Sequence, residues 1–117
     1  MISHGLRFQG NQFWVRHRRR DYGPFDYEWS SDLRGVELTF RGEKFGEYCS
    51  PEEIYADLKH ALIPRTVSEV GSIVLGCIVF GILNGRDESA RWELIERKLT
   101  ENGFERFARI TDSTEVL

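Results

Sequence analysis

Apolar and polar residues alternate in three segments of the first half of the chain. In each segment, apolar or aromatic side chains occupy every second position: Phe13 and Val15 with His17, then Phe25, Tyr27 and Trp29, then Val36, Leu38 and Phe40. A period of two, with many aromatic and β-branched residues, is typical of a strand that buries one face. The pattern therefore predicts three strands that share one apolar face.

The predicted strands also suggest a register. Residues directly opposite each other in an antiparallel pair lie on the same face of the sheet. The apolar positions match when Trp29 lies opposite Val36, Tyr27 opposite Leu38 and Phe25 opposite Phe40. For the first pair we expect Phe13 opposite Trp29 and Val15 opposite Tyr27, which places Arg16 across from Asp26. A turn at Gly42-Glu43 predicts a short fourth strand over residues 44–48.

After Tyr48 the apolar period changes from two to that of a helix. Ser50-Pro51-Glu52-Glu53 has the residue order of a capping box, with proline at the first helical position. Apolar side chains then follow at helical spacing, and Pro64 ends the segment. These side chains are Ile54, Tyr55, Leu58 and Leu62.

A nearly continuous apolar run over residues 67–83 predicts the central helix. Thr66-Val67-Ser68-Glu69 provides a second capping box, and Asn84-Gly85 suits a left-handed C-terminal cap. Two buried strands are the alternative, because many of these residues are β-branched. We favour a helix, since caps stand at both ends and the run exceeds normal strand length. Its glycines at 71, 76 and 81 either allow close approach of a neighbouring element or are tolerated without a special role.

A third helix is predicted to begin after Asp87 and to end at Asn102-Gly103. Trp92, Ile95 and Leu99 form its apolar stripe. The segment from Phe104 to Ile110 is expected to be a last strand or a docked tail.

Together these elements predict a single α+β domain spanning residues 1–117. Its strand-rich part covers residues 8–48, its helical part 51–102, and its C-terminal strand or tail 104–117. We expect an antiparallel sheet of three to four strands packed against two to three helices, because each apolar face must be covered by another layer.

Charge is distributed unevenly along the chain. The net charge is −3, from 16 basic and 19 acidic residues, yet five arginines precede the first acidic residue, Asp21. Such asymmetry can mark a surface for an acidic partner or for nucleic acid. The overall pI of about 5.6 argues against general nucleic-acid binding.

The sequence contains no pattern that indicates a metal, a cofactor or a catalytic group. Cys49 and Cys77 have no second cysteine or histidine at ligand spacing, and the three histidines lie on separate predicted elements. We therefore predict no catalytic residues, no metal site, no cofactor and no enzymatic activity. Unpaired cysteines and the absence of a secretory signal predict a cytoplasmic protein. The apolar run over 70–83 is too short to cross a membrane, so no membrane partner is expected.

The strongest candidate for function is the basic, aromatic segment around the first predicted hairpin. Arginine presents planar donors that grip carboxylate or phosphate and that stack on aromatic rings. Trp14 either anchors a partner from the open face or is covered by residues 104–110. The alternative interpretation is that Asp21 and Asp26 neutralise the charge of these arginines within the domain. The candidate binding residues are Trp14, Arg16, Arg18, Arg19, Arg20, Tyr22 and Phe25.

Two short motifs extend this reading. Tyr22-Gly23-Pro24-Phe25, preceded by Trp14, resembles the signature of bacterial GYF-type adaptor domains, which bind proline-rich peptides. The stretch from Phe45 to Ile54 resembles the same signature followed by its serine-capped helix, with Glu47 in place of proline. The resemblance implies an aromatic peptide groove lined by Trp14, Tyr22, Phe25 and Tyr48.

These observations predict a non-catalytic protein-interaction or regulatory module that uses a basic aromatic hairpin. Its partner would be a protein or an acidic or proline-rich peptide. Nucleic-acid binding through Arg16 to Arg20 is one alternative. A small-ligand carrier or enzyme with a cleft between helix and sheet is another. A homo-oligomer is also considered, because the apolar central helix could bury one side against a second copy.

Overall fold

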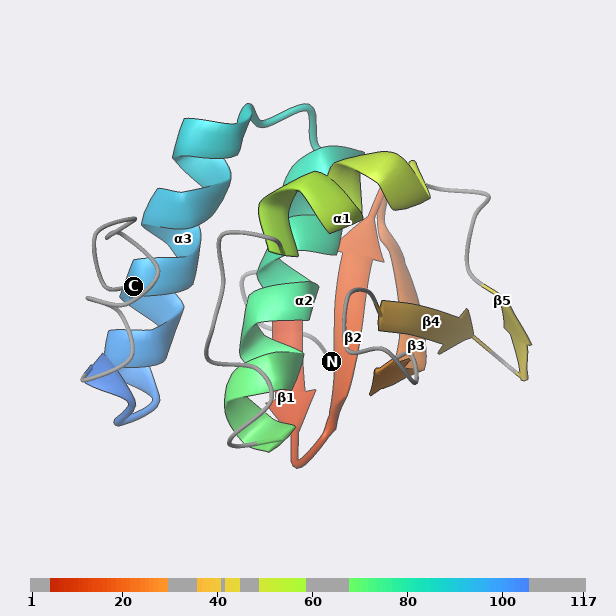
Figure 1. The fold of residues 1–117 in the computed structure, drawn as a ribbon, viewed down its shortest axis with the longest axis horizontal. Helices are drawn as coiled ribbons and strands as arrows, with labels where there is room; N and C mark the ends of the chain where they lie inside the picture. Colours follow the sequence, from red (N-terminus) through yellow and green to blue (C-terminus); the bar gives the residue numbers. More distant parts are fainter. Residues whose placement is uncertain (1–4, 30–35, 41, 45–48, 59–67, 106–117) are drawn as a thin grey trace.

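The computed structural model describes residues 5–29, 36–40, 42–44, 49–58 and 68–105. It shows an antiparallel sheet on one side and three helices on the other, which confirms the α+β fold (Figure 1). The strands are β1 (Leu6–Gln9), β2 (Gln12–His17), β3 (Arg20–Trp29), β4 (Val36–Phe40) and β5 (Glu43–Lys44). The helices are α1 (Pro51–Leu58), α2 (Ser68–Leu83) and α3 (Glu88–Glu101).

The sheet is a meander in the order β1-β2-β3-β4-β5. The predicted register of β3 and β4 is confirmed, from Phe25 opposite Phe40 to Trp29 opposite Val36. Strand β1 was not predicted, although its residues alternate, because four residues give a weak periodic signal. Strand β5 pairs two residues with β4, and residues 45–48 of the predicted fourth strand lie outside the described residues.

The predicted register of β2 and β3 is wrong. Phe13 lies opposite Phe25, four positions before the expected Trp29, and Val15 lies opposite Tyr22. The cause is the length of the connection: only Arg18 and Arg19 separate the strands, so β3 begins at Arg20. The shift is four residues at Phe13 and five at Val15, because a bulge lies between these two pairs, with two residues of β3 facing one residue of β2. The bulge keeps Tyr22 and Phe25 on the face of Val15 and Phe13, so the sheet still has one buried side.

Helix α2 lies across the apolar face of the sheet and forms the centre of the core (Figure 1). The segment forms one helix from Ser68 to Leu83, which confirms the helix in place of two strands. Every residue from Val70 to Val79 is buried. A Cβ atom built on Gly76 would lie 2.7 Å from Cε1 of Phe8, so this glycine permits close approach of the β1–β2 hairpin. The buried residues of α2 are covered by other parts of the same chain.

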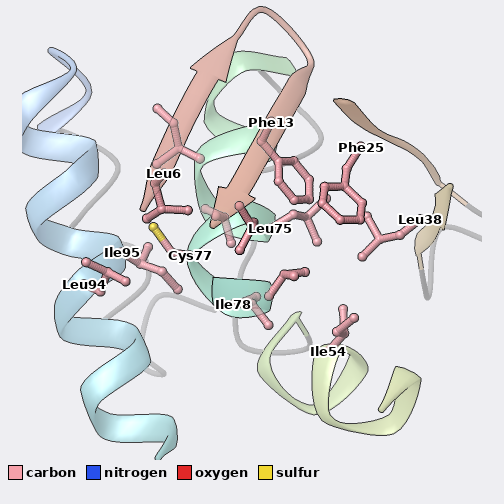
Figure 2. Close-up of a cluster of buried hydrophobic side chains, with 14 of the residues drawn as sticks. Leu6, Phe13, Phe25, Leu38, Ile54, Leu75, Cys77, Ile78, Leu94 and Ile95 are labelled. Atoms are coloured by element: carbon pink, nitrogen blue, oxygen red, sulfur yellow. The ribbon is translucent and has the colours of Figure 1, made fainter. Parts of the chain in front are cut away.

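Helices α1 and α3 flank α2, and Figure 2 shows Ile54 of α1 and Ile95 of α3 directed into the shared core. The Asp87 side chain accepts a hydrogen bond from the Ala90 amide, and Asn102 forms the C-terminal cap of α3, as predicted. The capping box of α1 does not form as expected: the Ser50 hydroxyl donates to Glu52. Tyr55 was expected on the apolar face of α1, yet it is 46% exposed.

A buried ion pair joins α1 to α3. Arg91 donates from Nε to one carboxylate oxygen of Asp57 at 2.6 Å and from Nη2 to the other at 3.1 Å. The Asp57 side chain has no exposed surface. A bidentate geometry of this kind satisfies both charges where water cannot reach them. Nothing in the sequence pattern indicated this pair.

The prediction for the C-terminal segment can be compared with the structure only at its start. Phe104 packs against the core, and its amide donates to the Leu99 carbonyl at 2.8 Å. Residues 106–117, and with them the predicted last strand or tail, lie outside the described residues.

Within the described residues, no helix is both long and apolar enough to cross a membrane.

Candidate interaction surface

The turn between β2 and β3 places two arginines in an unusual backbone conformation. Arg18 and Arg19 have φ angles of 50° and 64°. A two-residue hairpin turn with positive φ at both positions matches the right-handed twist of the strands and favours Asn-Gly. For residues with a Cβ atom, the left-handed region costs about 1–2 kcal/mol per residue. The protein therefore has two arginines where other residues would form a more stable turn.

The arginines at this turn are open to solvent. Arg18, Arg19 and Arg20 are all exposed, and among the described residues none of the three is paired with a carboxylate. Arg16 is different, because its Nη1 lies 3.5 Å from a carboxylate oxygen of Asp21. The expected neighbour of Arg16 was Asp26, which instead accepts a hydrogen bond from Gln12 Nε2 at 2.8 Å. We call Arg18, Arg19 and Arg20 the arginine tip.

Trp14 lies on the open face of the sheet. The guanidinium of Arg7, its partner across β1 and β2, lies 3.8 Å from the ring centroid. The indole also covers the backbone of β3, since a Cβ atom on Gly23 would lie 2.5 Å from Trp14 Cδ1. Trp14 is therefore half-buried by its own sheet, and Arg7 adds a further guanidinium to this face.

Tyr22 and Phe25 do not belong to the same surface as Trp14. Phe25 is completely buried and stacks on Phe13 and Phe40, with ring centroids 5.0 and 4.9 Å apart. Tyr22 contacts Phe40 edge to face on the same inner side. Tyr22 and Phe25 lie opposite the inward-facing Val15 and Phe13, and the bulge between these pairs keeps both rings on the face opposite to Trp14. Trp14, Tyr22 and Phe25 therefore do not line one groove, and Tyr48 lies outside the described residues.

The rest of the open face carries the opposite charge. Asp26, Glu28 and Glu37 are exposed on β3 and β4, and Glu28 lies directly opposite Glu37. Like charges in this position destabilise a sheet slightly, and Lys44 lies 3.7 Å from Glu37. Among the described residues, the positive charge of this face lies at the arginine tip, at Arg7 and Arg16 near Trp14, and at Lys44, which is paired with Glu37.

Neither cysteine offers a reactive group. Burial, reinforced by the nearby charge of Glu53, raises the pKa of the Cys49 thiol to about 12. Burial also raises the pKa of Cys77, which is completely enclosed beside α3 (Figure 2). Since the thiolate is the nucleophile and the metal ligand, both groups are inert near neutral pH. Three or more potential metal ligands do not gather anywhere in the described part of the chain.

Comparison with protein-family models, curated proteins and solved structures finds no match for this chain. The resemblance to GYF-type adaptor domains therefore stays a hypothesis that rests on the two short motifs.

Proposed function

We propose that this domain is a protein-interaction module whose arginine tip binds an acidic segment of a partner protein. The observation that carries the proposal is the pair of exposed arginines at positive φ. A strained conformation at an exposed turn contributes nothing to packing, so selection for stability alone favours other residues there. A guanidinium at each turn position supplies planar paired donors for carboxylates.

The charge of the open face favours a protein partner over nucleic acid. A duplex lying on this face would bring its phosphates toward Asp26, Glu28 and Glu37. An acidic peptide of a few residues is short enough to contact the arginine tip without reaching the acidic residues of this face. It can also bury part of Trp14 as an apolar anchor. The proposal therefore assigns the contact to the arginine tip with Trp14, and leaves Tyr22 and Phe25 to the core.

The interior of the fold bears on the alternative of a small-ligand carrier or enzyme. That alternative needs a cleft between helix and sheet. Between α2 and the sheet this space is filled by side chains without exposed surface, including Phe13, Phe25, Leu75 and Ile78 (Figure 2). The hollow between α1 and β4, which Leu38 and Ile54 help to line, measures only about 50 Å³, well below the usual size of a ligand site. We therefore propose a non-catalytic role. We also propose a cytoplasmic location, in keeping with two buried cysteines that are not joined to each other.

Selection from a displayed peptide library tests the proposal directly. The wild-type domain serves as bait, and the variant Arg18→Asn/Arg19→Gly serves for counter-selection. Asn-Gly suits the turn, so this variant is expected to fold at least as well as the wild type while lacking two guanidinium groups. If this variant is more stable than the wild type and binds more weakly, its loss of binding is not caused by unfolding.

We expect the selected peptides to be enriched in aspartate and glutamate and to bind the variant at least about tenfold more weakly. Arg86→Gln/Arg97→Gln is the matched control, because it removes the same charge from a different part of the molecule and should retain binding. A single-stranded and a double-stranded oligonucleotide are measured in parallel over a range of salt concentrations. Tighter, salt-dependent binding of an oligonucleotide through the tip would replace the peptide proposal by nucleic-acid binding.

A further inference from the structure

A hollow of about 400 Å³ lies between the end of α2 and the length of α3, away from the arginine tip. Its floor is apolar, with Phe80 from α2 and Leu94 from α3. Its remaining lining residues are charged: Arg86, Arg97, Lys98 and Glu101. The volume falls within the range of small-molecule sites. Four of the six lining residues are charged, so the lining is more polar than is usual for such sites and favours a ligand that carries a charge.

Arg86 is held in place at the edge of this hollow. After α2 ends, the Arg86 amide donates to the Gly81 carbonyl at 2.8 Å, and Gly85 adopts a φ of 71°. This is the hydrogen-bond pattern of a helix-terminating Schellman motif. The Arg86 carbonyl accepts from Arg91 Nη1 at 2.7 Å, and the Arg86 guanidinium lies 5.3 Å from the Phe80 ring centroid. The two hydrogen bonds fix the backbone of Arg86, and the contact with Phe80 orients its exposed side chain, which reduces the conformational entropy lost when the guanidinium binds an anion.

The charges around the hollow do not cancel. Lys98 Nζ lies 3.0 Å from a Glu101 carboxylate oxygen, so these two residues neutralise each other. Within the described ranges, neither Arg86 nor Arg97 is paired with a carboxylate. Two guanidinium groups beside an apolar floor therefore remain uncompensated. The complementary ligand has a negative head and an apolar body.

We propose that this hollow binds a small organic anion with an apolar chain, held by Arg86 and Arg97 and packed on Phe80 and Leu94. Carboxylate and phosphate monoester heads share the required chemistry, because both accept paired hydrogen bonds from guanidinium. The site is independent of the proposed peptide surface, since the two use different elements.

Amide chemical shifts of the isotope-labelled protein test this site. The probes are octanoate, octyl phosphate, 1-octanol and inorganic phosphate, each below its micelle-forming concentration. We expect octanoate or octyl phosphate to shift the amides of Phe80, Leu94 and Arg97, and the tighter of the two identifies the head group. Octanol and inorganic phosphate should bind at least about tenfold more weakly, because octanol lacks the negative charge and inorganic phosphate lacks the apolar chain.

Two variants examine the role of charge. Arg86→Gln/Arg97→Gln should weaken octanoate binding at least about tenfold, whereas Arg18→Asn/Arg19→Gly, which removes the same charge elsewhere, should not. Arg97→Glu alone keeps the contact of Arg86 with Phe80 and should also weaken binding. Equal binding of octanoate and octanol, shifts centred outside the hollow, or full affinity in the charge variants would each overturn the proposal. Failure here leaves the peptide-selection result unaffected.

Discussion

A Cβ atom built on Gly81 would lie 2.5 Å from Cγ of Arg91. The missing side chain at Gly81 lets the stem of Arg91 lie directly against α2, and from there its guanidinium reaches Asp57 on α1. One glycine, one arginine and one aspartate thus join all three helices. The missing side chain at Gly81 makes room for Arg91, and the ion pair joins α1 to α3 in addition to the core contacts of Ile54 and Leu58.

Loss of either charge in this pair should be strongly destabilising. Arg91→Met leaves the Asp57 carboxylate buried without its cation, and we expect a loss of about 3–5 kcal/mol in the free energy of unfolding. The double variant Asp57→Leu/Arg91→Met removes both charges and should recover much of that loss. Urea titration followed by circular dichroism measures both. A double variant as unstable as the sum of its single variants would contradict this account.

Gly76→Ala tests the close approach of α2 and the β1–β2 hairpin. The added methyl group would lie 2.7 Å from Phe8 and 3.2 Å from Phe13. Helix propensity favours alanine by about 1 kcal/mol, whereas overpacking a core costs about 1–3 kcal/mol, so the net effect should be destabilising. Ser89→Ala on the exposed side of α3 is the control and should be neutral or slightly stabilising. Chemical denaturation compares the two, and a more stable Gly76→Ala protein would show that Phe8 can move aside.

The arginine tip should carry a measurable cost in stability. Replacing Arg18 and Arg19 by Asn-Gly removes the strain of two side chains at positive φ, and we expect a gain of about 1–2 kcal/mol. Thermal unfolding of the wild type and the variant measures this gain. Arg20→Asn, which removes a charge within β3, is the control and should bring no such gain. If the tip variant is no more stable than the wild type, the turn is not strained and the main argument for its function is lost.

Stability should fall at alkaline pH. The pKa of Cys49 is about 12 in the folded protein, compared with an ordinary value of 9.0. Below pH 9 both states keep the proton and the contribution to stability is complete. As the pH rises from about 9 to 12, the unfolded chain loses the proton and the folded chain keeps it, so stability is progressively lost. Burial raises the pKa of Cys77 and Tyr27 in the same direction.

Urea midpoints at pH 7.5 and pH 10.5 measure this loss. The urea midpoint of Cys49→Ala should decrease less between the two pH values than the midpoint of the wild type does. An identical decrease in both would mean that the Cys49 thiol titrates normally in the folded protein.

The sequence predicted those features that depend on neighbouring residues. Asp87 begins α3 because its side chain accepts from an amide three residues later, and Asn84-Gly85 ends α2 because glycine adopts positive φ freely. The alternation of Phe25, Tyr27 and Trp29 with Val36, Leu38 and Phe40 was enough to set the register of β3 and β4. The helix ends depend on interactions between residues close in sequence. The register of β3 and β4 is restricted because all six apolar residues must lie on one face.

Other features required the tertiary structure. The register of β2 and β3 depends on a turn formed by Arg18 and Arg19, a pair that does not indicate positive φ. The pairing of Asp57 with Arg91 joins residues 34 positions apart, and both look like surface residues in a helical pattern. The inward side of Tyr22 follows from the bulge between the Phe13 and Val15 pairs, which strict alternation does not indicate. By itself the sequence determined the three helices and the apolar faces of β2, β3 and β4, because these follow from local periodicity and capping. The fold decided which charges are buried and which remain on the surface, because those depend on contacts between residues distant along the chain.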